Sequence, residues 1–162
     1  MSTDAQKKKV FDACCGSKMF YFDKEDERVL FNDRHPRKAI LCDGRVFECI
    51  PDTEDDFKNL PHSDNSFDLV IYDPPHITKA GENSYMAIKY GVCDFEDVVA
   101  GFKECWRITA GTLIFKWNDT HIKIKELVSA FGVQPLVGQR RNGSGQTNTI
   151  WLIFYKGAES IN

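Results

Sequence analysis

Short apolar runs bounded by turn-forming residues recur along the chain and predict buried β-strands. The predicted strands cover residues 10–13, 29–32, 45–50, 67–72, 112–117, 133–137 and 150–155. Apolar residues three and four positions apart predict helices at 95–106, with Asp94 as N-cap, and at 120–131, with Gly132 at the end. Strands that alternate with helices are typical of a parallel or mostly parallel α/β sheet with helices on its faces.

The run from Ser63 to His76 reads SDNSFDLVIYDPPH and carries the strongest signal. Its apolar residues 69–72 predict a strand buried on both faces. Pro74 and Pro75 end that strand, because a proline nitrogen cannot donate to a β-ladder. Asp73 therefore stands at the carboxyl end of a buried strand, where open α/β sheets bind ligands. An acid followed by two prolines and a ring can hold a flat, amine-bearing substrate.

The first predicted strand leads into Asp12-Ala13-Cys14-Cys15-Gly16-Ser17. A strand that ends in a tight glycine turn places backbone N–H groups and a helix N-terminus at the edge of the sheet, with Asp12 beside the turn. Asp33 ends the next strand, where an acid can hold the hydroxyls of a ribose. A structural turn and a solvated acid beside Arg34 and Arg37 are the alternatives. Together the two signals favour a nucleoside-type cofactor.

Composition narrows the class of protein. The 162 residues, 42% of them hydrophobic and 28% charged, indicate one globular domain over 1–162. We expect a cytoplasmic protein without a membrane segment, since no apolar run reaches membrane-spanning length and no secretory leader is present. The six cysteines form no CxxC pair, which predicts free thiols and no metal site. A net charge of −3 disfavours tight, non-specific nucleic-acid binding but leaves room for a local basic face.

Taken in order, these motifs resemble the class I S-adenosylmethionine-dependent methyltransferases, of the small kind found in bacteria and phages, over nearly the whole chain. The resemblance implies a Rossmann-like sheet, mostly parallel with an antiparallel late strand, and helices on both faces. GTLIFKWND at 111–119 resembles the fifth strand of the family. The implied ligands of S-adenosylmethionine, which leaves as S-adenosylhomocysteine, are Asp12, Ala13, Cys14, Gly16 and Ser17 for its methionine part, Asp33 for the ribose, and Asp56 and Phe57 for the adenine.

DPPH at 73–76 resembles the [DNS]PP[YFWH] motif of methyltransferases that modify an exocyclic or amide nitrogen. In this reading Asp73 and the carbonyl of Pro74 accept the two N–H groups of the amine and free its lone pair to attack the methyl group. His76 follows Pro75 and takes the place of the usual aromatic ring that stacks on the substrate. The resemblance implies methylation of adenine or cytosine in DNA or RNA, on a base flipped into the site.

Two other functions stay open. The acceptor could be a glutamine or asparagine amide of a protein, or the chain could be a non-catalytic subunit that binds a cofactor or a partner methyltransferase. A homodimer or a partner subunit is plausible, because no segment is large enough for a target-recognition domain. The glycine turn also lacks a second glycine, with Lys18 in its place.

Two sets of residues are candidates for contact with a nucleic acid. Tyr85, Lys89 and Tyr90, in the loop from Gly81 to Gly91, are predicted to face the substrate, although a loop that merely packs is as plausible. A phosphate-contacting face, as opposed to an ordinary solvated surface, would consist of Lys116, Lys123, Lys125, Arg140 and Arg141.

Overall fold

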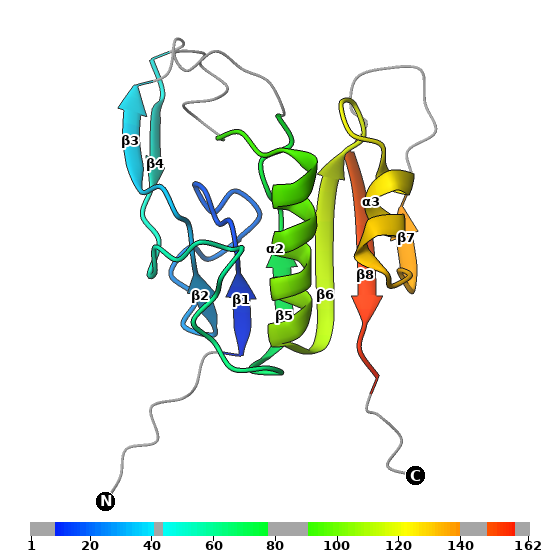
Figure 1. Ribbon diagram of the computed structural model, residues 1–162. Coiled ribbons are helices and arrows are strands. Elements are labelled where there is room, and N and C mark those ends of the chain that lie inside the picture. Colours follow the sequence, from blue (N-terminus) through cyan, green and yellow to red (C-terminus); the bar gives the residue numbers. More distant parts are fainter. Residues whose placement is uncertain (1–8, 41–43, 78–90, 140–148, 158–162) are drawn as a thin grey trace, which may run out of the picture.

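The computed structural model describes residues 9–40, 44–77, 91–139 and 149–157. Six strands form one sheet in the order β2-β1-β5-β6-β8-β7 (Figure 1). Their bounds are Val10–Asp12 (β1), Val29–Phe31 (β2), Phe67–Tyr72 (β5), Thr109–Asn118 (β6), Val137–Gln139 (β7) and Thr149–Tyr155 (β8). β1, β2, β5 and β6 are parallel, whereas β8 is antiparallel to both of its neighbours. The mostly parallel sheet with a late antiparallel strand is confirmed.

The predicted strands at 67–72 and 150–155 agree closely with β5 and β8. β5 lies between β1 and β6, and its Val70 and Tyr72 are fully buried, as the apolar run implies. The strand expected at 133–137 is wrong in position, because β7 begins only at Val137.

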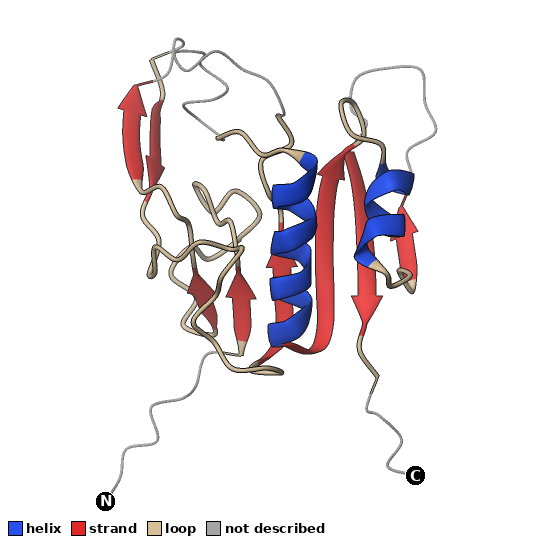
Figure 2. Ribbon diagram, in the orientation of Figure 1, coloured by secondary structure: helices blue, strands red, loops and turns tan. Residues whose placement is uncertain are grey.

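Helices α2 (Phe95–Ile108) and α3 (Ile124–Phe131) lie on the same face of the sheet (Figure 2). Asp94 caps α2 as predicted, accepting from the backbone N–H of Asp97. α3 begins after Lys123, not at Thr120. The apolar stripes of the two helices meet where the ring of Phe102 stacks on that of Phe131, with 3.7 Å between the centroids. This contact joins both helices to the core.

The other face is covered differently in the described part of the chain. No helix follows the glycine turn, since residues 13–28 form only turns and bends. Instead this segment lays Phe20 against Trp151 of β8, with ring centroids 5.4 Å apart. Helices were expected on both faces and are described on one, and the helix N-terminus expected at the glycine turn is absent.

A hairpin stands apart from the main sheet in Figure 1, formed by β3 (Arg37–Ile40) and β4 (Val46–Cys49). The sequence predicted a third strand of the parallel sheet at 45–50, which is wrong, because β4 pairs antiparallel with β3 and joins no strand of the main sheet. Alternating exposure explains the difference. Val46 is exposed while Phe47 is buried, which suits a ribbon with one covered face.

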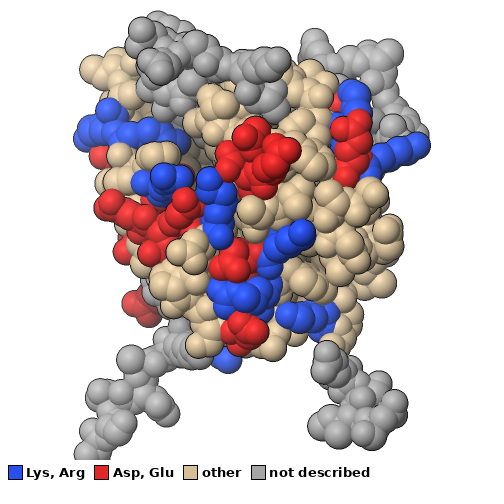
Figure 3. Space-filling model, in the orientation of Figure 1, with Lys and Arg blue, Asp and Glu red and all other residues tan. Residues whose placement is uncertain are grey.

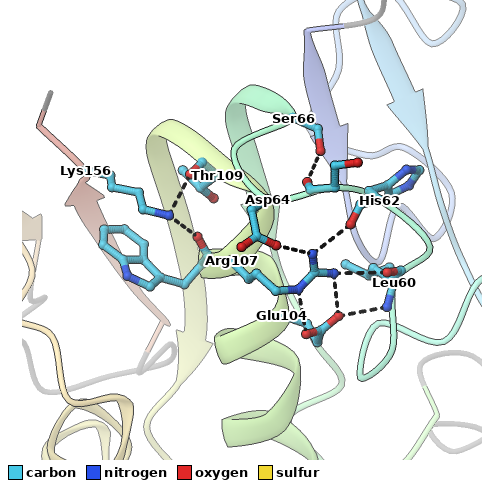
Figure 4. A network of polar contacts seen from close by, with 10 residues as sticks. Leu60, His62, Asp64, Ser66, Glu104, Arg107, Thr109 and Lys156 are labelled. Carbon is cyan, nitrogen blue, oxygen red and sulfur yellow. Dashed lines mark hydrogen bonds and ion pairs between the residues drawn. The ribbon is translucent and has the colours of Figure 1, made fainter. Parts of the chain in front are cut away.

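A polar network ties the end of α2 to the segment that precedes β5 (Figure 4). The Arg107 guanidinium donates to the backbone carbonyls of Leu60 (3.1 Å) and His62 (2.7 Å) and pairs with Asp64 and Glu104. Five charged or carbonyl groups therefore meet at the amino end of β5, opposite the end where Asp73 lies. The network fixes how the strand enters the sheet.

Candidate active site

A cavity of about 490 Å³ opens at the carboxyl ends of the parallel strands. Its size suits a small-molecule ligand or cofactor. Ten of the twelve predicted cofactor and catalytic residues line it, namely Ala13, Cys14, Gly16, Ser17, Asp33, Phe57, Asp73, Pro74, Pro75 and His76. Asp12 and Asp56 do not. The topology thus brings the glycine turn, the acid after β2 and the acid after β5 to one cavity.

Asp12 lies beneath the glycine turn. Its carboxylate is 1% exposed and accepts from the backbone N–H of Cys14 (3.1 Å) and the hydroxyl of Tyr21 (2.8 Å). Burial raises the pKa of Asp12 to about 7, and these two hydrogen bonds oppose that rise in part. Asp12 therefore supports the turn from below.

The turn uses its own backbone N–H groups. The amide of Cys15 donates to the carbonyl of Asn32 (2.8 Å), and that of Gly16 donates to Asp33 Oδ2 (3.1 Å). Lys18 has a φ of 55°, in the left-handed region that favours glycine, at the position where the family resemblance led us to expect one. The backbone at Lys18 thus adopts a conformation typical of glycine. The hydrogen bond from Gly16 also fixes the Asp33 carboxylate relative to the turn.

Asp33 stands at the cavity wall with its side chain 13% exposed. Besides Gly16, it accepts from the backbone N–H of His35 (2.9 Å) and lies 3.3 Å from Arg37 Nη1. The carboxylate is held in place from three sides and faces the cavity, where a ribose hydroxyl could donate to it.

Asp56, predicted to face an adenine amine, does not itself line the cavity but pairs at 2.9 Å with Arg34, which does. Phe57 does line the cavity and packs its ring near that of Tyr72. Lys58 and Asp97 line the same region as an ion pair of 2.6 Å. In this structure Asp97 of α2, which sequence reasoning missed, is the acid that reaches the cavity near Phe57.

Asp73 forms an ion pair with Lys116 of β6, with 2.8 Å between Oδ2 and Nζ. The two side chains are 19% and 21% exposed. Burial raises the pKa of the Asp73 carboxyl, and the adjacent Lys116 ammonium opposes that rise. Among the described residues, Lys116 is the only one that hydrogen-bonds the Asp73 side chain, and it does so through Oδ2.

The three residues after Asp73 form the adjoining wall of the cavity. Gly91 lies beside Pro75, where an added Cβ would make ordinary contact with Pro75 Cγ at 3.4 Å, and it is the φ of +79° that favours glycine at this position. Burial lowers the pKa of His76, so its ring is neutral near pH 7. A neutral ring beside a buried carboxylate can stack on a flat substrate.

Lys116 was a candidate for a phosphate-contacting face, and the structure places it in the lining of the cavity, where its ammonium pairs with Asp73. The strand period explains it: Phe115 points to the helix-covered face, so Lys116 points to the other. Arg140 and Arg141, like the predicted substrate residues Tyr85, Lys89 and Tyr90, lie outside the described residues.

One group in the described part of the chain has the geometry of a metal site: Cys15, Asp33 and Cys49, whose ligand atoms lie within 4.8 Å of one another. The hydrogen bond to Cys49 and burial both raise the pKa of the Cys15 thiol, so it stays protonated. Arg37 also lies beside the Asp33 carboxylate. The protonated Cys15 thiol and the neighbouring Arg37 guanidinium favour simple packing of the hairpin on the turn.

Acidic and basic side chains are interspersed over the face that carries α2 (Figure 3). This face therefore lacks the broad basic surface that non-specific nucleic-acid binding uses. In the ranges that the structure describes, no helix has the length and apolar character needed to cross a membrane.

No protein family model matches the chain, and no curated protein matches it significantly. Solved structures do resemble it. A protein of Pyrococcus horikoshii OT3 has a TM-score of 0.56 at 14% identity, over 92% of this chain and 81% of that one. A SAM-dependent methyltransferase of Leishmania major has a TM-score of 0.53 at 14% identity, over 90% and 63% of the two chains. One of Methanosarcina mazei has 0.53 at 14%, over 91% of each. The chain shares their Rossmann-like fold.

Proposed function

We propose that this chain is an S-adenosylmethionine-dependent methyltransferase that methylates an exocyclic amine of adenine or cytosine in a nucleic acid. One observation carries the proposal: the glycine turn, Asp33 and the Asp73–His76 motif line a single cavity. A cofactor and an acceptor bound there would be adjacent, as direct group transfer requires. The shared fold with SAM-dependent methyltransferases supports the choice of cofactor.

The residues present fit that cofactor. Asp33 offers a fixed carboxylate for the ribose, Phe57 an apolar ring for the adenine, and Asp97 an acid close by. Ser17 lines the cavity at the glycine turn, where the methionine part would lie. When bound, S-adenosylmethionine supplies an electrophilic methyl group on its sulfonium.

Asp73, Pro74 and His76 form the half of the site that binds the acceptor, and they bind an amine through its two N–H groups. Asp73 and the backbone carbonyl of Pro74 accept the two N–H bonds, which draws the nitrogen out of conjugation with the ring and frees its lone pair. His76 stacks on the ring. Asp73 accepts most strongly when it is ionised, and the Lys116 ammonium at 2.8 Å favours its charged form.

The test is methyl transfer from tritium-methyl S-adenosylmethionine to the DNA, RNA and protein fractions of a bacterial lysate. We expect label in a nucleic-acid fraction and at least a hundredfold less with Asp73→Ala, the order of magnitude for loss of an oriented polar group. Asp68→Ala, an exposed acid on the same strand, is the matched control and should retain activity.

Binding of S-adenosylhomocysteine, measured by calorimetry, separates loss of chemistry from loss of fold. Asp73→Ala should bind it as the parent does. Near-normal transfer by that variant would refute the mechanism. Label only in protein would move the acceptor to a side-chain amide, and absence of cofactor binding by the parent would refute the function.

A further inference from the structure

From the geometry we infer that Phe20 and Lys116 form the second half of the acceptor site and select a planar heteroaromatic ring whose amine stands beside a hydrogen-bond acceptor. This inference rests on the proposed function and deepens it by naming two residues that distinguish the acceptor base. Neither residue was predicted to contact the substrate ring. Both line the same cavity as Asp73 and His76.

Lys116 is a donor at a place where the motif supplies only acceptors. One of the three N–H groups of its ammonium is used on Asp73 Oδ2, 2.8 Å away. Asp73 thus holds the Lys116 ammonium next to the position where the amine of the acceptor would bind. A second N–H group can donate to a ring nitrogen or oxygen adjacent to that amine. The pair offers an acceptor and a donor side by side.

Phe20 provides a flat apolar surface next to this pair. Its ring centroid lies 4.4 Å from Lys116 Nζ, and Trp151 of β8 supports the ring from the side. The Lys116 ammonium stands over one face of this ring, and Phe20 is 41% exposed and lines the cavity, so part of the ring remains open to a ligand. A base held at Asp73 can stack on Phe20 as well as on His76.

The hydrogen-bond pattern distinguishes the bases. Adenine presents its amine beside N1, and cytosine presents its amine beside N3, so each offers a donor next to an acceptor. Thymine and uracil have no exocyclic amine. The amine of guanine has the N1–H donor on one side, which Lys116 would oppose, and the N3 acceptor on the other. The site should therefore accept adenine or cytosine and reject thymine and uracil. A protein amide also has the donor and acceptor but no ring for Phe20.

The experiment is an NMR titration of the full chain, saturated with S-adenosylhomocysteine so that its own adenosine cannot compete. The probes are the DNA trinucleotides TAT, TCT and TTT, followed by the RNA trinucleotides UAU, UCU and UUU to identify the sugar. Binding is followed at the indole N–H of Trp151. We expect TAT or TCT to bind at least about tenfold more tightly than TTT, a ratio worth about 1.4 kcal/mol.

Matched variants test each residue. Phe20→Ala should weaken binding about tenfold, as expected for one lost stacking partner, and Phe20→Leu should also weaken it while preserving bulk. Phe22→Ala, a fully exposed phenylalanine of the same segment, should change nothing. Lys116→Met should remove most of the preference over TTT, whereas Lys103→Met, at an exposed position, should keep it.

The outcomes separate the inference from the function beneath it. If S-adenosylhomocysteine binds but no trinucleotide does, or if both phenylalanine variants at 20 bind like the parent, the inference is overturned while the methyltransferase function stands. Retained preference in Lys116→Met overturns the assignment of that lysine. If S-adenosylhomocysteine itself does not bind, the proposed function fails first.

Discussion

Asp12 makes the stability of this protein depend on pH in an unusual direction. Asp12 is 1% exposed beneath the glycine turn. Among the described residues its carboxylate accepts hydrogen bonds from Cys14 and Tyr21, and the carboxylates of Asp73 and Asp33 oppose its ionisation. The informative change is Asp12→Asn, because an asparagine oxygen can still accept from Cys14 while its amide donates to the Tyr21 oxygen. The variant keeps the shape and removes the charge.

The magnitude follows from the two pKa values. The pKa of Asp12 is about 7 in the folded protein, compared with about 3.9 for an unfolded aspartate. A pKa difference of one is worth about 1.4 kcal/mol, so burying the ionised form costs about 4 kcal/mol. Since the folded pKa is the higher one, the stability is fully present below about pH 4 and is lost as the pH rises through about 7. Roughly 3 kcal/mol of the loss falls between pH 4.5 and 8.

Urea denaturation of the parent and of Asp12→Asn at pH 4.5, 6 and 8 measures this effect. At each pH the free energy of unfolding of the parent is subtracted from that of the variant. This difference should be about 3 kcal/mol larger at pH 8 than at pH 4.5. Asp68→Asn, on an exposed site of β5, controls for the introduction of an asparagine into the sheet. A difference that changes by less than about 1 kcal/mol would refute the reasoning, since it would mean that Asp12 reaches water or a further donor.

Two further predictions concern Asp33 in the cavity wall and the polar network of Arg107 at the amino end of β5. Asp33→Ala should weaken binding of S-adenosylmethionine by about 1–3 kcal/mol, because a charge-assisted hydrogen bond to the ribose and the hydrogen bond to Gly16 are both lost. The dissociation constant is measured by calorimetry. An unchanged value would exclude Asp33 as the ribose ligand. Arg107→Met should lower the free energy of unfolding by about 1–3 kcal/mol, because the carbonyls of Leu60 and His62 lose their donor. Lys103→Met, exposed on the same helix, is its control, and equal stability of the two variants would contradict the role of the network.

The sequence predicts much of this cavity, because strand ends are readable from local patterns. Asp33 and Asp73 each follow a short apolar run, and parallel strands bring their carboxyl ends to one edge. Phe20 and Lys116 were missed for a physical reason. Their contact also involves Trp151, so it joins three segments far apart in the chain, and no local periodicity encodes it.

The strands likewise include some that local sequence patterns predict and others that they do not. β5 stands out in the sequence since it is buried on both faces, whereas β3 has the sequence Arg-Lys-Ala-Ile and no apolar alternation that would mark it as a strand. Its pairing with β4 takes a predicted strand out of the main sheet. Likewise a helix was expected to begin at the glycine turn, yet Phe20 and Tyr21 after it pack on Trp151 and Phe31 of the sheet without forming a helix.

The position of β8 has a consequence for the order in which the chain folds during synthesis. Among the described strands, β7 hydrogen-bonds only to β8, which leaves the ribosome after it and inserts between β7 and β6. β7 therefore has no strand to pair with until β8 is made. Trp151 arrives with β8 as well, so the support of Phe20 forms last. Strands β1, β2 and β5, which position Asp33 and Asp73, can therefore pair before β8 is made. The contact between Trp151 and Phe20 in the cavity can form only after β8 has been synthesised.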